Sequence, residues 1–422
     1  MSGAVFAAIF KEYFLIGGCM ETIRVGDLQN GMVLAEDVHD MYGRRLLTAG
    51  CVINEKNLEI LKTWGISDVC VTVESKIALG IQHTEKKNEP VSGESLELFS
   101  LVDRNDPLIR EIWQQSISIR SKRPYDRFLK NTKEVAPPQR NSLPANPAAI
   151  IEMGEFTALP EVYNHILSVI NDERSSAIDI SDAVTKDPSF TSRLLNLANS
   201  SFYALKNSVD TVSKAVSIIG TRQLGTLALG ISISRSFFKR GENDASLTEF
   251  WRHSIATAIA ARTLAIFLKE KNTERYFIGG LLHDIGKLLL YTRLHDAVYY
   301  IDTICRSHSL TQFTAERSIL GFSHSDIGRE LCLKLNMPEN LLAMITDHHS
   351  VAESLRPFEA TIIHFADIIV NGIKKGSSGE LYVPPLQEAA REYLSLKPAA
   401  IDAVVRQVET HSEEITEIML HD

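Results

Sequence analysis

Histidine and aspartate recur inside apolar stretches of the second half of the chain, where they could bind metal ions. In "GLLHDIGKLLLY" (280–291), His283 and Asp284 interrupt a run of apolar residues, and burying such groups without partners is unfavourable. Imidazole nitrogens and carboxylate oxygens suit iron, manganese, zinc and nickel, and a carboxylate can bridge two ions. The candidate metal ligands are His253, His283, Asp284, His324, His348, His349 and Asp367.

The number and order of these residues carry the prediction. The dipeptide His-Asp occurs four times in the chain, so it is uninformative alone. A single buried histidine is also more often a hydrogen-bonded core residue than a ligand. Eight of the 13 histidines, however, fall between His253 and His364. Glu249 precedes His253 by four residues and shares its helix face.

The segments that carry these residues have the apolar spacing of α-helices. No alternating β-pattern interrupts residues 150–370. Asp187 and Pro188 form a typical helix start, and Gly220 a typical stop. The helices predicted around the ligands span 247–269, 274–291, 311–335, 338–349 and 357–373. We therefore predict an all-helical bundle in which separate helices bring the ligands together.

The rest of the chain divides by composition. Short β-branched runs and turn residues over 22–74, with helical spacing around Leu58 and Leu61, predict a small β-rich module. Prolines and basic residues gather in 120–147, as is typical of a linker. The predicted parts are an extension at 1–19 ahead of a native start at Met20, the β-rich module at 20–75, a helical segment and linker at 76–147, the helical domain at 148–373 and C-terminal helices at 374–422.

Composition restricts the class of protein. The net charge of −9 disfavours nucleic-acid binding. The five cysteines are scattered without a CxxC pair, which is typical of reduced thiols. No apolar stretch reaches the roughly 20 residues of a membrane span, and the apolar segment 3–18 lacks the basic region of a signal peptide. We expect a cytoplasmic protein that binds neither membranes nor nucleic acid.

Several motifs resemble those of a known superfamily. The order His253, His283-Asp284 and Asp367 resembles the HD superfamily of metal-dependent phosphohydrolases, and "GLLHDIGK" is close to its core motif. His324 and His348-His349 resemble the larger ligand set of HD-GYP cyclic dinucleotide phosphodiesterases, some of which carry an extra ligand where Glu249 falls. Over about 152–370, "LPEVYNHILSVIND", "DAVTKDPSFTSRLLNLANSSFY", "TVSKAVSIIGTRQLGTLAL" and "FWRHSIATAIAAR" resemble the HDOD domain of bacterial signalling proteins. "VGDLQNGMVLAEDVHDMYGRRLLTAGCVI" resembles a small module often found ahead of such domains.

The chain departs from the HD-GYP pattern after the paired histidines. HD-GYP enzymes continue into a glutamate and a Gly-Tyr-Pro loop that shapes the substrate site. Here Ser350 follows His349, and only 17 residues separate His349 from Asp367. A metal pair without this loop would supply a nucleophile but little orientation, which can be worth about 7–11 kcal/mol of barrier.

Two functions remain open. The HDOD resemblance implies a signalling regulator that binds proteins or a small regulatory ligand and retains a divalent transition-metal pair, for which we expect iron or manganese, with zinc as the alternative. The other function is a metal-dependent phosphohydrolase, in which metal-activated water attacks phosphorus and Lys287 stabilises the developing charge. We favour the regulator.

Overall fold

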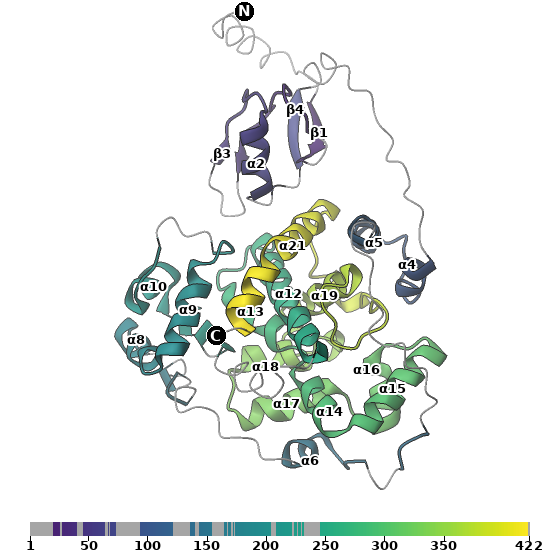
Figure 1. Cartoon of the computed structure of the whole chain (residues 1–422). Coiled ribbons are helices and arrows are strands. Elements are labelled where there is room, and N and C mark those ends of the chain that lie inside the picture. The colour runs from purple at the N-terminus through teal and green to yellow at the C-terminus, as the bar shows by residue number, and fades with distance from the viewer. Residues whose placement is uncertain are drawn as a thin grey trace, which may run out of the picture. The chain divides into compact units, whose positions relative to one another are not determined.

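The computed structural model of the chain divides into two compact units (Figure 1). Unit 1 comprises residues 1–90 and 397–406, and unit 2 comprises 91–396 and 407–422. The predicted extension at 1–19, residues 73–92 and most of the predicted linker lie outside the residues that the structure describes. The described residues are 20–25, 28–39, 45–63, 66, 68–72, 93–120, 136–139, 143–153, 164–166, 168–169, 172, 174–203, 208–221, 223–225, 227–228, 230–231 and 245–420.

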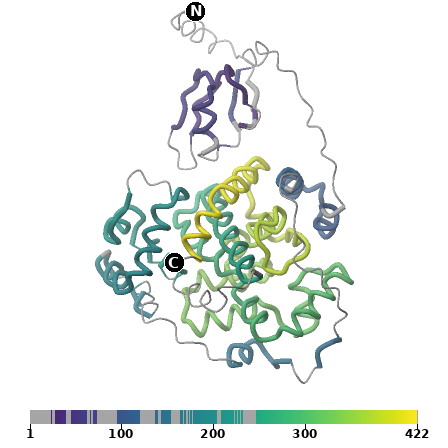
Figure 2. The backbone as a smooth tube through the Cα atoms, in the orientation of Figure 1, coloured from purple at the N-terminus to yellow at the C-terminus, as the bar shows by residue number. Residues whose placement is uncertain are grey.

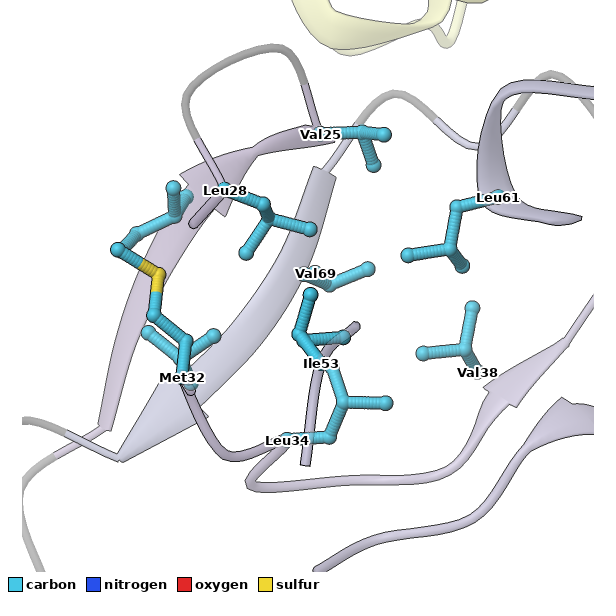
Figure 3. Close-up of a cluster of buried hydrophobic side chains, with 10 residues drawn as sticks. Val25, Leu28, Met32, Leu34, Val38, Ile53, Leu61 and Val69 are labelled. Atoms are coloured by element: carbon cyan, nitrogen blue, oxygen red, sulfur yellow. The ribbon is translucent and has the colours of Figure 1, made fainter. Parts of the chain in front are cut away.

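Unit 1 contains the predicted β-rich module. Strand β1 (Met20–Arg24) pairs antiparallel with β4 (Asp68–Thr72), and β2 (Val38–His39) pairs antiparallel with β3 (Arg45–Leu47). Helix α2 (Glu55–Thr63) lies between β3 and β4 in the chain. In β4, Val69 and Val71 are buried because alternate residues of a strand share a face. Figure 3 shows Val69 with Leu61 of α2 and Leu34 in the module's core.

Unit 2 is helical throughout its described elements, which confirms the mainly α fold class. Its helices and one 3₁₀ turn are α4 (Gly93–Leu98), α5 (Pro107–Arg120), α6 (Pro147–Glu152), α8 (Ala177–Thr185), α9 (Pro188–Asn199), α10 (Val212–Ile219), α12 (Ala245–Phe267), α13 (Glu274–Leu282), α14 (Ile285–Arg293), α15 (His295–His308), α16 (Gln312–Leu320), α17 (His324–Lys334), α18 (Glu339–Thr346), η3 (Val351–Glu353), α19 (Pro357–Ile373) and α20 (Glu388–Arg391). The last helix, α21 (Pro398–Leu420), has residues in both units.

Helices α12, α13 and α19 form the centre of unit 2 (Figures 1 and 2). Residues 253–265 of α12 are buried on every face of the helix, as expected for a helix surrounded by others. Helix α19 is likewise buried from Ala360 to Ile373. On one side of α19, α5 packs against it, and Val383 N donates to Leu98 O of α4 at 2.8 Å. Both α4 and α5 therefore belong to the helical unit.

Local sequence signals explain where the helices begin and end. The Asp187 carboxylate accepts a hydrogen bond from Phe190 N, with Pro188 as the first residue of α9. This geometry confirms the predicted start. Gly220 ends α10 with φ +100°, which confirms the predicted stop, since such a backbone conformation favours glycine.

Two predicted helices are each divided in the structure. The span 274–291 contains α13 and α14, which meet at His283 and Asp284. The span 311–335 contains α16 and α17, separated after Gly321, whose φ is +83°. Apolar spacing continued across both breaks and concealed them. Among the described residues, no helix combines the length and hydrophobicity needed to cross a membrane.

Candidate metal centre

The structure brings all seven principal candidate ligands together from five places in the helical unit. His253 and Asp367 project from the interiors of α12 and α19, whereas the other five lie at helix ends. His283 is the C-cap residue of α13, and Asp284 is the N-cap residue of α14. Neighbouring side chains on a continuous helix diverge by about 100°. The break between α13 and α14 therefore allows both to face the same centre.

Close packing at glycine sets the position of His324. A Cβ atom on Gly286 of α14 would collide with His324 O, the backbone of the first residue of α17. Glycine is therefore required for α14 and the start of α17 to approach each other so closely. This contact places the His324 ring beside Asp284, and His324 Nε2 lies 3.2 Å from Asp284 Oδ1.

The candidate ligands form two groups, in each of which the possible ligand atoms lie within 4.8 Å of one another. The first group is His253, His283 and Asp367, and the second is Asp284, His324, His348 and His349. Within the first group, His253 Nε2 lies 3.0 Å from Asp367 Oδ1. All of these residues are buried except His349, which is partly exposed.

Asp284, a member of the second group, also faces the first group. Its Oδ1 is 3.7 Å from His348 Nε2, while its Oδ2 is 3.3 Å from His283 Nε2 and 3.9 Å from His253 Nε2. The two oxygens of one carboxylate thus face different groups. This is the arrangement that a carboxylate bridging two metal ions requires.

Glu249, the additional candidate, belongs to neither group. Its Oε1 accepts a hydrogen bond from Arg252 Nη1 at 3.0 Å, and its backbone oxygen accepts one from Ser377 N at 3.0 Å. Helical spacing correctly put Glu249 near His253. The Glu249 carboxylate, however, accepts its hydrogen bond from Arg252, one turn further along α12.

Three of the ligand histidines have one ring nitrogen fixed and the other directed at the centre. Each Nδ1 hydrogen bonds to an oxygen of the protein, which leaves Nε2 as the ligand atom. The bonds are His283 Nδ1 to Gly280 O at 2.7 Å, His324 Nδ1 to Glu316 Oε2 at 2.6 Å and His348 Nδ1 to Ile345 O at 2.9 Å. Metal-ligating histidines are usually oriented in this way, with the second nitrogen held by a carboxylate or backbone carbonyl.

Six of the atoms that face the centre are buried, and none of these six makes a well-directed hydrogen bond to a described residue. They are His253 Nε2, His283 Nε2, Asp284 Oδ1, Asp284 Oδ2, His324 Nε2 and His348 Nε2. A buried polar atom left unsatisfied costs about 1–3 kcal/mol. Since several such atoms converge on one point, and all are nitrogen or carboxylate donors, the site fits a transition metal.

The electrostatics of the centre favour a charged Asp284 and neutral His348 and His349. Burial alone would lower the pKa of His283 and that of His324, but Asp284 raises the pKa of His283 to about 10 and Glu316 raises that of His324 above its usual value. Burial alone would raise the pKa of Asp284, but the charges of His283 and Lys287 hold it well below its usual range. Burial lowers the pKa of His348 to about 4 and that of His349 well below its usual value. An anionic carboxylate and neutral imidazoles are the protonation states in which these groups bind metals, so a metal bound by His283 and His324 would release their protons.

Lys287 is buried and lies beside Asp284 in the candidate metal centre. Its Nζ is 2.9 Å from Asp284 Oδ2 and donates to Ser378 Oγ at 3.2 Å. Burial alone would lower the pKa of Lys287, but Asp284 raises it above its ordinary value. The ammonium is therefore a fixed positive charge beside the Asp284 carboxylate.

Sequence reasoning missed the residues that support the ligands. Glu316 holds His324, and Asn371 Nδ2 donates to Asp367 Oδ1 at 2.8 Å. Asn371 follows Asp367 by four residues, so helical spacing could have identified it. Ser378 lies in the segment that follows α19, and its proximity to Lys287 depends on the fold.

Comparison with known proteins identifies the domain. Residues 156–351 match the family model of the HDOD domain, so this part of the chain is an HDOD domain. Six of the seven candidate ligands lie within the match, and Asp367 follows it. An uncharacterized protein of Treponema pallidum (strain Nichols) is 22% identical over 219 residues, which cover 50% of this chain and 42% of that relative's length.

Solved structures are similar to this chain. An HDOD domain protein of unknown function from Geobacter sulfurreducens has a TM-score of 0.52 and 20% identity, covering 65% of this chain and 97% of its own. A protein from Marinobacter aquaeolei VT8, named as a candidate signal transduction protein, covers 96% of both chains at 18% identity with a TM-score of 0.48. The first of these likenesses supports the helical fold described above.

Proposed function

We propose that this protein is a cytoplasmic signalling regulator of the HDOD type whose helical domain contains a binuclear transition-metal centre. The observation that carries the metal assignment is the pairing of fixed Nδ1 atoms with inward-facing, unsatisfied Nε2 atoms on His283, His324 and His348. A histidine that served only packing would gain from bonding both nitrogens. The four described cysteines are free thiols, which supports a reducing compartment.

Each ion of the proposed pair would have its own ligand group. His253, His283 and Asp367 would hold one ion, and His324, His348 and His349 the other, with Asp284 shared between them. Five imidazoles and two carboxylates suit iron, manganese or zinc better than magnesium or calcium, which prefer oxygen ligands. We favour iron or manganese. A bound divalent pair supplies Lewis acidity and lowers the pKa of coordinated water.

The chain after His349 supports regulation over turnover. Gln387 Nε2 donates to His349 O at 2.6 Å, and Gln387 Oε1 accepts from Val351 N at 3.0 Å. Gln387 N donates to His364 Nε2 at 3.2 Å. One glutamine thus fastens the backbone beside His349 to the start of η3 and to α19. This arrangement takes the place of the long substrate-shaping loop of HD-GYP enzymes.

A metal-dependent phosphohydrolase is the second candidate, and one observation favours it. The full ligand set is accompanied by Lys287, whose ammonium lies 2.9 Å from Asp284 Oδ2. In such an enzyme Lys287 would stabilise the charge that develops on a phosphoryl oxygen. The burial of Lys287 restricts this role to a substrate that enters the centre itself.

Metal analysis combined with a hydrolysis assay separates these possibilities. Purified protein and the H283A/D284A double variant are analysed for bound metal, and each is assayed with cyclic di-GMP and with bis(p-nitrophenyl) phosphate. We expect metal in the wild type, its loss in the double variant, and negligible hydrolysis by both. Catalytic turnover by the wild type that disappears in a folded double variant would establish the phosphohydrolase. A folded wild type free of metal would refute both candidates.

A further inference from the structure

The segment that follows α19, residues 374–383, lies directly against the turn of α12 that ends at His253. Ser377 N donates to Glu249 O at 3.0 Å. Gly376 has φ +74°, and a Cβ atom there would collide with His253 N. The connecting segment, as we call 374–383, therefore touches the backbone of a residue of the first ligand group, at a position where glycine is required.

The connecting segment also contacts the second ligand group through Lys287. Ser378 Oγ accepts a hydrogen bond from Lys287 Nζ at 3.2 Å, and the same Nζ lies 2.9 Å from Asp284 Oδ2. Tyr291, one turn further along α14, donates its hydroxyl to Ser378 O. Ser378 is itself buried. Lys287 thus has two partners, a carboxylate of the centre and a hydroxyl of the segment.

A buried glutamate anchors the end of the segment at α16. Glu380 Oε2 accepts from Gln312 N at 2.9 Å, at the start of α16. Its Oε1 accepts from Leu381 N at 3.0 Å, and burial raises the pKa of Glu380. Because both ends of the segment are held, a change at Ser378 must be accommodated in the few residues between α19 and Glu380.

One of those residues, Lys375, forms ion pairs with α21. Lys375 Nζ lies 3.5 Å from Glu409 Oε1 and 3.3 Å from Glu413 Oε1. Glu414, which follows Glu413 in α21, contacts the residues that follow α9, since its Oε1 accepts from Ser201 N at 3.0 Å. The connecting segment therefore lies between the metal centre and α21, and α21 continues to the helices at the N-terminal side of the HDOD domain.

We propose that the connecting segment transmits the occupancy of the metal centre to α21. The inference rests on the proposed function, because it requires the centre to bind metal. Without metal, Lys287 is the nearest cation to Asp284. Two divalent ions would supply the positive charge that Lys287 provides, so its attraction to Asp284 weakens and its bond to Ser378 changes in strength. This change in the hydrogen bond between Lys287 and Ser378 then alters the ion pairs of Lys375 with Glu409 and Glu413.

Hydrogen exchange of the intact protein tests this coupling. The metal-loaded and chelator-treated forms are compared by mass spectrometry, and metal stoichiometry is measured in the same samples. We expect peptides covering 375–382 and 409–420 to exchange about fivefold or more slowly in the loaded form, at the lower end of typical coupling between sites. Local protection of this kind reports the opening free energy of each segment.

Two variants and a control locate the pathway. Ser378→Ala should retain metal but lose the metal-dependent protection of 409–420. Lys375→Gln should also lose the metal-dependent protection of 409–420. It should keep the metal-dependent protection of 375–382, because the Lys287–Ser378 contact is intact. Ser307→Ala is the matched control, since Ser307 Oγ hydrogen bonds to Thr303 O, Ile304 O and His308 Nδ1 on the exposed side of α15, and it should behave like the wild type.

The outcomes separate this inference from the proposed function. Wild-type protein that binds metal but exchanges identically over 409–420 in both forms would overturn the coupling and leave the metal centre standing. Retention of the full α21 response in Ser378→Ala would overturn the route through Lys287. Absence of bound metal in the folded wild type would refute the proposed function, and the coupling with it.

Discussion

Glu316 accepts two hydrogen bonds from His324, one from its backbone nitrogen at 2.8 Å and one from ring Nδ1 at 2.6 Å. The carboxylate sits one turn before the end of α16, and His324 is the first residue of α17. This pair of bonds both joins the two helices and fixes the direction of His324 Nε2 toward Asp284. Glu316 is fully buried, so its effect on the ring is not screened by solvent.

Replacing Glu316 by glutamine should lower metal affinity about 10–100-fold, the usual effect of removing a partner of a metal-ligating histidine. The amide keeps the shape but loses the negative charge that orients the imidazole. Competition with a chelating dye measures the change. Glu330→Gln is the control, because Glu330 pairs with Arg329 at the surface of α17. Equal affinities of the two variants would contradict the role of Glu316.

The two ligand groups should lose metal independently. His324→Ala removes a ligand of one group and Asp367→Asn one of the other, so each should retain about one ion per chain if the pair is binuclear. Asp284→Asn removes the shared carboxylate and should lose both ions. Elemental analysis with protein quantification gives these ratios. Identical metal content in all three variants would exclude two separate ion positions.

The ion pair between Arg262 and Glu274 should contribute to stability more than exposed pairs do. Arg262 Nε donates to Glu274 Oε1 at 2.9 Å, and Tyr203 donates its hydroxyl to Glu274 Oε2 at 2.5 Å. Glu274→Ala leaves a buried guanidinium without its carboxylate, so we expect a loss of about 3–5 kcal/mol in the free energy of unfolding. Chemical denaturation provides the value.

The control for this variant is Asp302→Ala, which breaks a more exposed pair with Arg306. We expect it to cost about 0–1 kcal/mol. If the two variants lost the same free energy of unfolding, the buried network around Glu274 would have no special importance for the packing of Tyr203 on α13.

Asp106 should give α5 a stability that disappears in acid. Its Oδ1 accepts from Leu108 N at 2.9 Å and Ile109 N at 3.0 Å. Burial raises its pKa, but the hydrogen bonds from Ile109 and Arg391 outweigh burial and hold the pKa below the ordinary 3.8. A carboxylate with a lowered folded-state pKa stabilises above the unfolded-state pKa, and this contribution is lost as the pH falls through the folded-state pKa.

Asp106→Ala should therefore cost about 1 kcal/mol near neutral pH, the usual value of a helix cap. The difference from the wild type should remain constant while the pH stays well above 3.8 and narrow below that value. Denaturation curves at a series of pH values measure it. A difference that widened in acid would show that Asp106 does not act as the charged cap of α5.

Much of the fold and most of the site could be predicted from the sequence. Apolar spacing identified the helices that carry His253 and Asp367, because both residues occupy buried positions of long helices. The same spacing ran through His283 and Asp284 without revealing the break between α13 and α14. Apolar periodicity records which face is buried, and that face continues across the break.

The supporting residues could not be predicted in the same way. The contacts of Glu316 with His324 and of Ser378 with Lys287 join residues that are separate in the sequence, and neither follows a local pattern. Glu249 shows the converse, since spacing placed it beside His253 but could not predict that Arg252 would engage its carboxylate.

The metal content of the purified wild-type protein tests the central claim most directly. Protein purified without chelators is analysed for transition metals, and circular dichroism confirms its helical fold. The converging Nε2 and carboxylate atoms predict about two transition-metal ions per chain, iron or manganese, each with the nitrogen and oxygen ligands these metals accept. A helical, folded protein that contains no transition metal and takes up none on addition would contradict the claim and show that these histidines serve the core alone.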